Sequence, residues 1–266
     1  MKKLLYAVAA IVVSLSTVSC SEETKSTSVE PMNIEFWEVC DADMIYELYN
    51  FFYNGEADAC VLTALAESEE VEVVKEENLR PFSSLLVAEY PFKDRKGKTQ
   101  TCCVGGYVGD YVFAAASKKN MAKINEYLAL EEVQARLNYI TNGEVLIAWS
   151  YKNTMENSRG GVYLLYALQG NGGLFPAMDG SGIVSAKAVK GKWGGFEVSI
   201  TMNDRAAEEW ADLTEMNIGK PLAIVMDNVV YSAPNVRGRI EGGKSSITGN
   251  FTLTEALALA KLINAN

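Results

Sequence analysis

The sequence of 266 residues contains no histidine. Histidine is the most frequent general base, the most frequent metal ligand and the side chain whose charge changes near neutral pH. Its absence excludes nucleophiles activated by a serine–histidine or cysteine–histidine pair. A zinc ion would have to be held by thiolates and carboxylates alone. We therefore expect a protein that binds without catalysing a reaction, with no cofactor and no metal.

Cysteine is also scarce, with five residues in the whole chain. Apart from Cys20 these are Cys40, Cys60, Cys102 and Cys103, and in an oxidising compartment four cysteines allow three pairings. Two adjacent cysteines on a strand point to opposite faces, so at most one of Cys102 and Cys103 would join a partner in the core. We expect one disulfide among the four, with its pairing open. A four-thiolate metal site is not favoured, because the Cys-x-x-Cys spacing is missing.

Positive charge is in deficit as well. The chain has 34 acidic and 24 basic residues and a net charge of −10. Nucleic acids and anionic lipid head groups bind to basic surfaces, so they are poor partners for this chain. We expect no nucleic-acid ligand.

The first 19 residues have the pattern of a secretory signal. Lys2 and Lys3 precede an apolar run over 4–18, which is shorter than the ~20 residues of a membrane span and fits the apolar region of a signal peptide. Cys20 follows Thr17-Val18-Ser19, a loose form of a lipoprotein cleavage box that lacks the usual leucine three places before the cysteine. We expect a signal peptide over 1–19 and lipid attachment at Cys20. The alternative is an ordinary cleaved signal with an incidental cysteine.

The expected lipid anchor sets the expected location. Residues 20–32 are polar and predict a flexible tether, and no later stretch is apolar enough to cross a membrane. Ser21 argues against the inner-membrane retention signal that places aspartate after the lipidated cysteine. Ser21-Glu22-Glu23 is similar to an acidic export tag of Bacteroidetes-type lipoproteins. We therefore expect the cell envelope, and within it the outer membrane, on its periplasmic or cell-surface face.

The remaining chain alternates between strand and helix patterns. Alternating apolar and acidic residues predict a half-buried strand over 34–39, and periodic apolar residues predict a helix over 44–52. The charged stretch 93–98 predicts the tip of a hairpin, and 144–151 predicts another strand. The fold class is α+β, mainly antiparallel sheet with helices packed on one side. We expect an N-terminal subdomain over 33–152, a connecting segment over 153–182 and a second subdomain over 183–266.

The last third has the clearest local signals. The sequence motifs are Phe196-Glu-Val-Ser-Ile-Thr-Met-Asn203, a helical pattern over 204–216, Asn217-Ile-Gly-Lys220, and Leu222-Ala-Ile-Val-Met-Asp227. Ser232-Ala-Pro234, Gly242-Gly243 and Ile247-Thr-Gly-Asn-Phe-Thr252 follow. Thr252 and Glu255 have capping-box spacing and predict the start of a last helix.

The order of these motifs resembles that in the large extracytoplasmic domain of SecD, the membrane subunit that assists protein export. The resemblance is specific over 183–263, and a weaker one extends upstream to Ile34, toward SecD forms of Bacteroidetes-type bacteria. It implies a SecD head-like fold with a base and a mobile head that touch the preprotein, and it implies no active site. The residues that match are architectural, at turns and strand ends: Asn203, Gly219, Lys220, Asp227, Pro234, Gly242, Gly243, Gly249, Asn250 and Thr252.

Departures from the SecD pattern matter as much as the matches. The membrane spans, the Asp- and Gly-rich segment after the first span and the first part of the base are missing, and the sequence ends at Asn266. Asn228 replaces the usual turn glycine, and Met226 replaces a leucine. We therefore expect a head-like domain on a lipid anchor that cannot pump with the proton motive force by itself.

Three functional hypotheses remain. The favoured one is a non-enzymatic envelope protein that binds extended polypeptide or an envelope protein partner, possibly accessory to export, through an exposed strand edge and loop aromatics. The candidate binding residues are Trp193, Phe251, Phe175, Tyr107 and Tyr111. The alternative is a surface lipoprotein that captures a glycan or another ligand. A weaker third hypothesis is an enzyme that uses Lys244-Ser245-Ser246, although these residues lie at the entry of a predicted strand.

Overall fold

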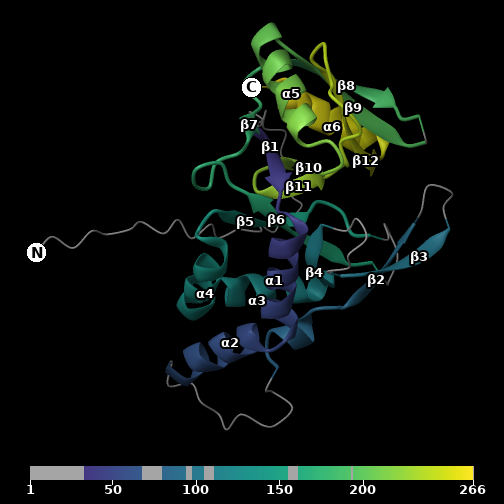
Figure 1. Ribbon diagram of the computed structural model, residues 1–266. Helices are drawn as coiled ribbons and strands as arrows, with labels where there is room; N and C mark the ends of the chain where they lie inside the picture. The colour runs from purple at the N-terminus through teal and green to yellow at the C-terminus, as the bar shows by residue number, and fades with distance from the viewer. Residues whose placement is uncertain are drawn as a thin grey trace, which may run out of the picture.

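The computed structural model describes residues 33–67, 80–93, 98–104, 111–154, 161–192 and 194–265. The predicted signal and tether lie outside the described residues. Twelve strands and six α-helices in the described residues build two lobes on one large sheet (Figure 1). The α+β fold class is confirmed.

The large sheet has seven strands. In spatial order they are β4 (Val112–Ala116), β6 (Tyr163–Gln169), β5 (Val145–Ser150), β11 (Val229–Ser232), β10 (Leu222–Met226), β1 (Ile34–Val39) and β7 (Met178–Asp179). A further pairing joins the end of β1 to β6, with Val39 opposite Leu168. The pairings β1–β10, β10–β11, β11–β5, β5–β6 and β6–β1 therefore close a ring of five strands.

One tryptophan and six aliphatic side chains fill the ring. They come from all five strands: Trp37, Val39, Ala148, Leu168, Ala223, Val225 and Val230. Side chains alternate across a strand, so the neighbouring residues of β1 and β10 point outward. Phe36 and Ile224 belong to the core of one lobe.

The lower lobe holds four helices on the outside of the ring, namely α1 (Ala42–Tyr53), α2 (Glu56–Glu67), α3 (Lys118–Leu128) and α4 (Glu131–Thr141), of which α2 lies farthest from the ring and packs on α1 and α4 (Figure 1). Its core joins Phe51, Phe52, Phe82 and Phe113 to β6. A short 3-10 helix (Ser83–Leu85) leads into the hairpin of β2 (Glu89–Lys93) and β3 (Thr99–Cys103). The antiparallel pairing of β2 and β3 agrees with the predicted hairpin, whose tip at 94–97 lies outside the described residues.

The upper lobe holds a second sheet of three strands, in the order β12 (Lys244–Phe251), β9 (Phe196–Met202) and β8 (Ile183–Lys190). Helices α5 (Asp204–Met216) and α6 (Leu253–Ile263) pack with it against the ring. The core of this lobe includes the outward side chains of β1 and β10, so the first and last parts of the chain share one core.

The helix caps and turns predicted in the last third of the chain are confirmed. The Asn203 side chain accepts from Ala206 N–H and caps α5, and Thr252 with Glu255 forms the capping box of α6. Asp227 and Asn228 both have positive φ, which gives the tight turn between β10 and β11. Three predicted turn glycines also have positive φ: Gly219, Gly242 and Gly243.

Other matched positions join strands and loops. Lys220 and Pro234 accept backbone hydrogen bonds from Val236 and Leu222. A Cβ on Gly249 would lie 2.4 Å from the Phe251 ring, so the strand needs glycine at this position. The side chain of Asn250 lies outside the described residues.

Residues 153–182 do more than connect. This segment contains β6 and β7, both of which pair with β1. The expected connecting segment is therefore part of the large sheet, in which strands far apart in the sequence pair with one another.

The expected disulfide is not present, because none of the four described cysteines forms a disulfide in the structure. Cys40 lies in the lower core with its Sγ 3.7 Å from Gln169 Oε1, and Cys60 packs at the margin of the same core. Cys102 packs in a separate cluster with Tyr90. Burial raises the pKa of the Cys40 thiol to about 12, so it stays protonated at neutral pH.

Among the described residues, no helix is both long enough and apolar enough to cross a membrane.

Candidate functional site

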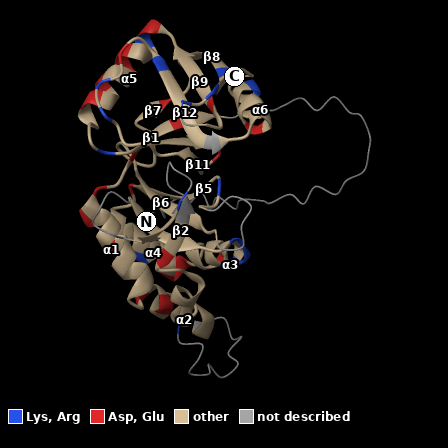
Figure 2. Cartoon of the chain, turned by 90° about the vertical axis from the view of Figure 1, so that its right-hand side faces the viewer, with Lys and Arg blue, Asp and Glu red and all other residues tan. Residues whose placement is uncertain are grey.

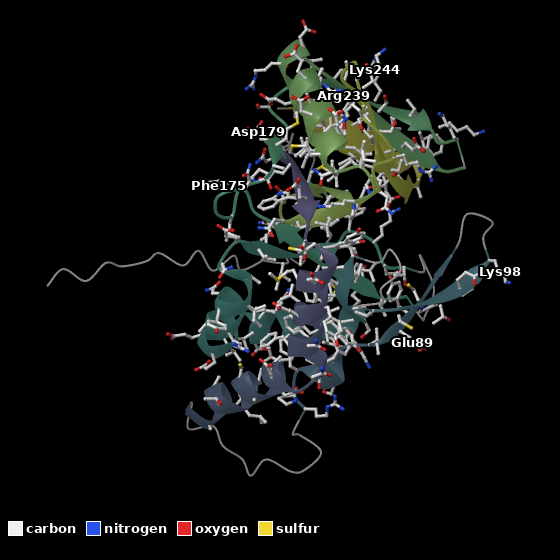
Figure 3. The ribbon with its side chains drawn as sticks, viewed as in Figure 1. Glu89, Lys98, Phe175, Asp179, Arg239 and Lys244 are labelled. Carbon is white, nitrogen blue, oxygen red and sulfur yellow. The ribbon has the colours of Figure 1, made fainter. Side chains whose placement is uncertain are left out.

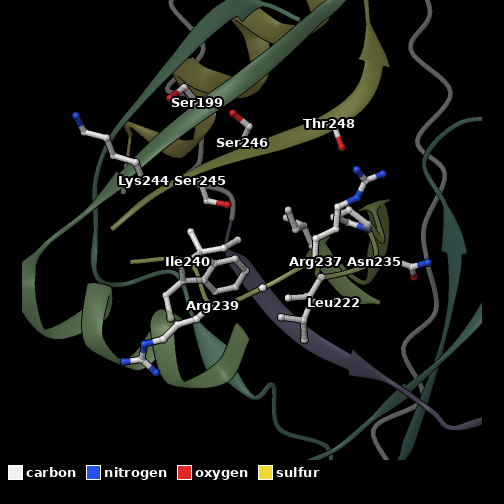
Figure 4. A pocket seen from close by; sticks show the side chains of 15 residues that line it. Ser199, Leu222, Asn235, Arg237, Arg239, Ile240, Lys244, Ser245, Ser246 and Thr248 are labelled. Atoms are coloured by element: carbon white, nitrogen blue, oxygen red, sulfur yellow. The ribbon is translucent and has the colours of Figure 1, made fainter. Parts of the chain in front are cut away.

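A groove of about 650 Å³ runs beside β12 in the upper lobe (Figure 4). Its volume is within the usual range of ligand sites, about 300–1,000 Å³. Trp210, Leu222 and Ile224 line its apolar part. The chain from Pro234 to Ile240 forms one wall, and β12 forms the other. In Figure 4, Arg237, Arg239 and Ile240 lie across β12 from Ser199.

The wall of the groove on the side of β12 is an open strand edge. β12 pairs only with β9 in the described structure, and it is the end strand of its sheet. Met202 N–H donates to Gly243 O at 2.8 Å, which fixes the phase of the antiparallel ladder. In an antiparallel pair, hydrogen-bonded and non-hydrogen-bonded residues alternate along the strand. The backbone N–H and C=O groups of Ser245 and Ile247 therefore bond to β9, and those of Lys244 and Ser246 point away from it. The edge therefore offers unpaired N–H and C=O groups along the groove.

The opposite edge of the same sheet is covered at Ala186. Ala186 N–H on β8 donates to Asn264 Oδ1 at 2.7 Å, and Asn264 Nδ2 donates to Ala186 O at 2.8 Å. The side-chain amide thus occupies both backbone groups of Ala186 as a neighbouring strand would. Exposed edges attract other strands, and covering them prevents unwanted pairing. The contrast singles out β12 as the accessible edge.

The second wall is held in place from several directions. Val236 N–H donates to Lys220 O at 2.9 Å, and Gly219 N–H donates to Val236 O at 2.8 Å. Ile240 N–H donates to Thr214 Oγ1 at 3.0 Å. The Arg239 guanidinium bonds Asp212 at 2.8 Å and also pairs with Glu215 and Glu241. These bonds fix the wall to α5 and to the start of β10.

One end of the groove meets the junction of the two lobes. Ser232 Oγ lies 3.4 Å from Thr248 Oγ1, between β11 and β12. The Tyr231 ring stacks on the Tyr151 ring at 4.2 Å, and burial raises the Tyr231 pKa to about 12. This stack is continuous with β5, so the groove end is tied to the lower lobe.

An ion pair reinforces the same junction. Lys152 Nζ lies 2.8 Å from Glu255 Oε2 in the capping box of α6. Partial burial disfavours the Glu255 carboxylate, but hydrogen bonds from Lys152 and Thr252 outweigh it and lower the pKa. The Glu255 carboxylate therefore both completes the capping box of α6 and forms the ion pair with Lys152.

The predicted aromatic binding residues do not come together. Trp193 and Tyr107 lie outside the described residues. Phe251 is 2% exposed and packs in the upper core, so its ring is not offered to a ligand. Tyr111 is half-buried against the side chains within the ring. Phe175 is 65% exposed on the loop after β6, away from β12 (Figure 3).

The sequence missed the groove residues Trp210 and Arg237. The sequence predicted a helix over 204–216 but gave neither Trp210 nor Arg237 a role in binding. A usable signal was present in β12 itself, because Lys244, Ser246 and Thr248 recur at every second position. Such polar alternation indicates a strand face that does not enter the core.

The Lys–Ser arrangement considered for an enzyme has no support in the geometry. Lys244 and Ser245 are neighbours on a strand, so their side chains point to opposite faces. In Figure 4 the Lys244 side chain extends away from the Ser245 hydroxyl.

Comparisons with known proteins place this fold. The family model described as "SecDF, P1 head subdomain" matches residues 167–266, which include the upper lobe and the groove. SecD of Rhodothermus marinus is 33% identical over 180 residues, which are 68% of this chain and 28% of that protein. SecD of Sebaldella termitidis is 40% identical over 88 residues, 33% of this chain and 22% of that protein.

Two solved SecDF structures are also similar. The one titled "Structure and function of a membrane component SecDF that enhances protein export" is 19% identical, with a TM-score of 0.35 over 88% of this chain and 93% of that one. A SecDF crystal structure in a super-membrane-facing form is 17% identical, with a TM-score of 0.36 over 90% of this chain and 29% of that one.

The upper lobe is thus an α+β domain with one open and one covered sheet edge. This chain contains a SecD head-like domain. It spans 28% of the length of the Rhodothermus relative and 22% of the Sebaldella relative.

Proposed function

We propose that this chain is a non-enzymatic envelope protein that binds extended polypeptide segments, as an accessory to protein export. The observation that supports it best is the open edge of β12 beside the groove. A segment that lies in the groove can pair with the outward backbone groups of Lys244 and Ser246. Main-chain bonds of this kind give affinity with little demand on sequence, which suits a protein that meets many different chains.

The relatives support the same direction. They are named protein translocase subunits, and the SecDF head family model matches the residues that form the groove. None of the described helices could cross a membrane. Capture of an emerging segment requires only binding, so the accessory role needs no catalytic site.

Proline at position 246 tests strand addition. The Ser246 N–H points away from β9, so Ser246→Pro removes a donor from the open edge without removing a ladder bond. We expect the dissociation constant for an uncharged, unstructured decapeptide of alternating valine and serine to rise about ten-fold, from the lost hydrogen bond and the bulk of the ring. Fluorescence anisotropy of the labelled peptide measures it.

Lys190→Pro is the matched control. Lys190 is opposite Phe196, so its N–H also points away from β9, but on the β8 edge. Binding should stay unchanged in this variant. Peptides N-methylated on alternate amides give an independent test on the wild-type protein: one methylated set should lose binding and the other retain it. Equal binding of the two sets would rule out strand addition.

We also propose that the chain is anchored in the outer membrane by lipid on Cys20. The sequence pattern around Cys20 supports it, and the polar stretch 21–32 would separate the anchor from β1. Two or more acyl chains give stable anchoring. Replacing Cys20 with serine should move the protein from the detergent phase to the aqueous phase in a Triton X-114 partition. An unchanged partition would place the anchor elsewhere.

A further inference from the structure

The groove is positively charged although the protein is acidic. Three of its lining residues are cationic, Arg237, Arg239 and Lys244, and none is acidic. The chain as a whole has a net charge of −10. Acidic side chains are abundant on the neighbouring helix α5 (Figure 2). The absence of acidic residues from the groove lining is therefore a local exception to the composition.

Two of the three cations are uncompensated. Arg239 pairs with Asp212, Glu215 and Glu241, so its charge is already neutralised. Neither Arg237 nor Lys244 has an ion-pair partner among the residues that the structure describes. Both are exposed on opposite walls of the groove, one on the 234–240 segment and one on β12. A negative charge between the walls would be attracted by both.

A further donor is buried in a residue that lines the groove. Trp210 is 4% exposed, and its Nε1–H has no hydrogen-bond partner among the residues that the structure describes. An indole nitrogen only donates, and a buried donor without an acceptor is unfavourable. The two cationic side chains that face the groove, Arg237 and Lys244, have hydrogen-bond donors and no acceptor, whereas the outward backbone of β12 supplies both N–H and C=O groups. The complementary ligand is rich in acceptor oxygens.

We infer that the groove prefers extended polypeptide segments that carry carboxylate side chains. This inference rests on the proposed strand addition at β12, which supplies the backbone pairing. Alternate side chains of an added strand would then face the groove walls. A carboxylate at such a position meets Arg237, whose planar guanidinium suits bidentate pairing. The acidic remainder of the surface repels the same segment, which confines it to the groove.

Peptides of one scaffold and different charge test the preference. In the alternating valine–serine decapeptide, two serines are replaced by glutamate or by lysine. We expect the glutamate peptide to bind about five- to ten-fold more tightly than the uncharged one at low salt, and the lysine peptide more weakly. The differences should shrink at high salt, because exposed charges are screened.

Charge-removing variants locate the effect. The double variant Arg237→Gln with Lys244→Gln should lose the preference for glutamate, so that the glutamate peptide and the uncharged peptide bind it with the same dissociation constant. The matched control is Lys187→Gln with Lys190→Gln, which removes the same charge from β8, outside the groove. The control should keep the preference. If the control lost it equally, net charge rather than the groove would be responsible.

The outcomes separate this inference from the proposed function. If the uncharged peptide fails to bind the wild type, strand addition is wrong. If it binds and the glutamate peptide gains nothing, only the preference for carboxylates is wrong. A ten-residue thymidine oligonucleotide serves as a competitor. Displacement of the glutamate peptide by equimolar oligonucleotide would make the groove a general polyanion site and overturn the preference for acidic polypeptide.

Discussion

Replacing Asp58 with alanine should lower the free energy of unfolding by about 3–5 kcal/mol. Asp58 lies on α2 and is 3% exposed. Its Oδ1 accepts from the backbone N–H groups of Phe82 at 2.7 Å and Ser83 at 2.9 Å, and Oδ2 accepts from Ser83 Oγ at 2.6 Å. Alanine leaves these buried donors without acceptors, each at a cost of about 1–3 kcal/mol. Urea unfolding followed by circular dichroism measures the loss.

The loss should extend to the packing of the lower lobe. The hydrogen bonds of Asp58 hold Phe82 in the core, where its ring lies 5.0 Å from the Phe52 ring and 5.9 Å from the Tyr127 ring. Asp58→Asn is the matched variant, because its amide oxygen can still accept from both backbone groups. It should lose less than half as much stability as the alanine variant. Equal losses would mean that the negative charge, rather than the acceptor geometry, is what stabilises this contact.

Substitution of Gly180 by alanine should destabilise the fold by about 2–4 kcal/mol. A Cβ at this position would lie 2.0 Å from Ile34 Cγ2 and 2.7 Å from the Ile34 carbonyl oxygen. The backbone oxygen cannot move without shifting β1, which pairs here with β7. Overpacking of this kind costs about 1–3 kcal/mol, and the displaced pairing adds to it. Thermal unfolding compared at equal protein concentration measures the change.

Gly238→Ala is the control for the loss of glycine itself. A Cβ on Gly238 meets no atom within 4 Å. Its stability should stay within about 0.5 kcal/mol of the wild type, as for most surface substitutions. If both variants lost the same stability, unfolded-state entropy rather than the contact with Ile34 would be the cause.

Local structure in the last third was predictable because its signals lie within a few residues. Thr252 and Glu255 cap α6 through groups three positions apart, and Asp227-Asn228 turns the chain because both residues tolerate positive φ. The partners of β1 were not predictable. Glu38 pairs with Leu222 on one side and Gln169 on the other, and no local pattern specifies which distant strand fills each position.

The groove was predictable only in part. An exposed strand edge was expected from the sequence, but not which edge. That choice depends on Asn264, a residue at the end of α6 whose amide reaches the backbone of Ala186. The exposure of Phe251 was mispredicted because a Gly-rich neighbourhood resembles a surface loop, while its ring in fact packs back into the core.

The closed ring of strands has a mechanical consequence. Asn33 leads directly into β1, and β1 is flanked by β10 on one side and by β7 and β6 on the other. Tension applied to the chain at Asn33 along the strand must shear the hydrogen bonds of both flanks together, whereas a strand at a free edge can be peeled one bond at a time. Because β1 supplies side chains to the upper core and to the ring, extraction of this strand would open the upper core and the ring at once. The end of the domain that faces the predicted tether is thus built to bear load.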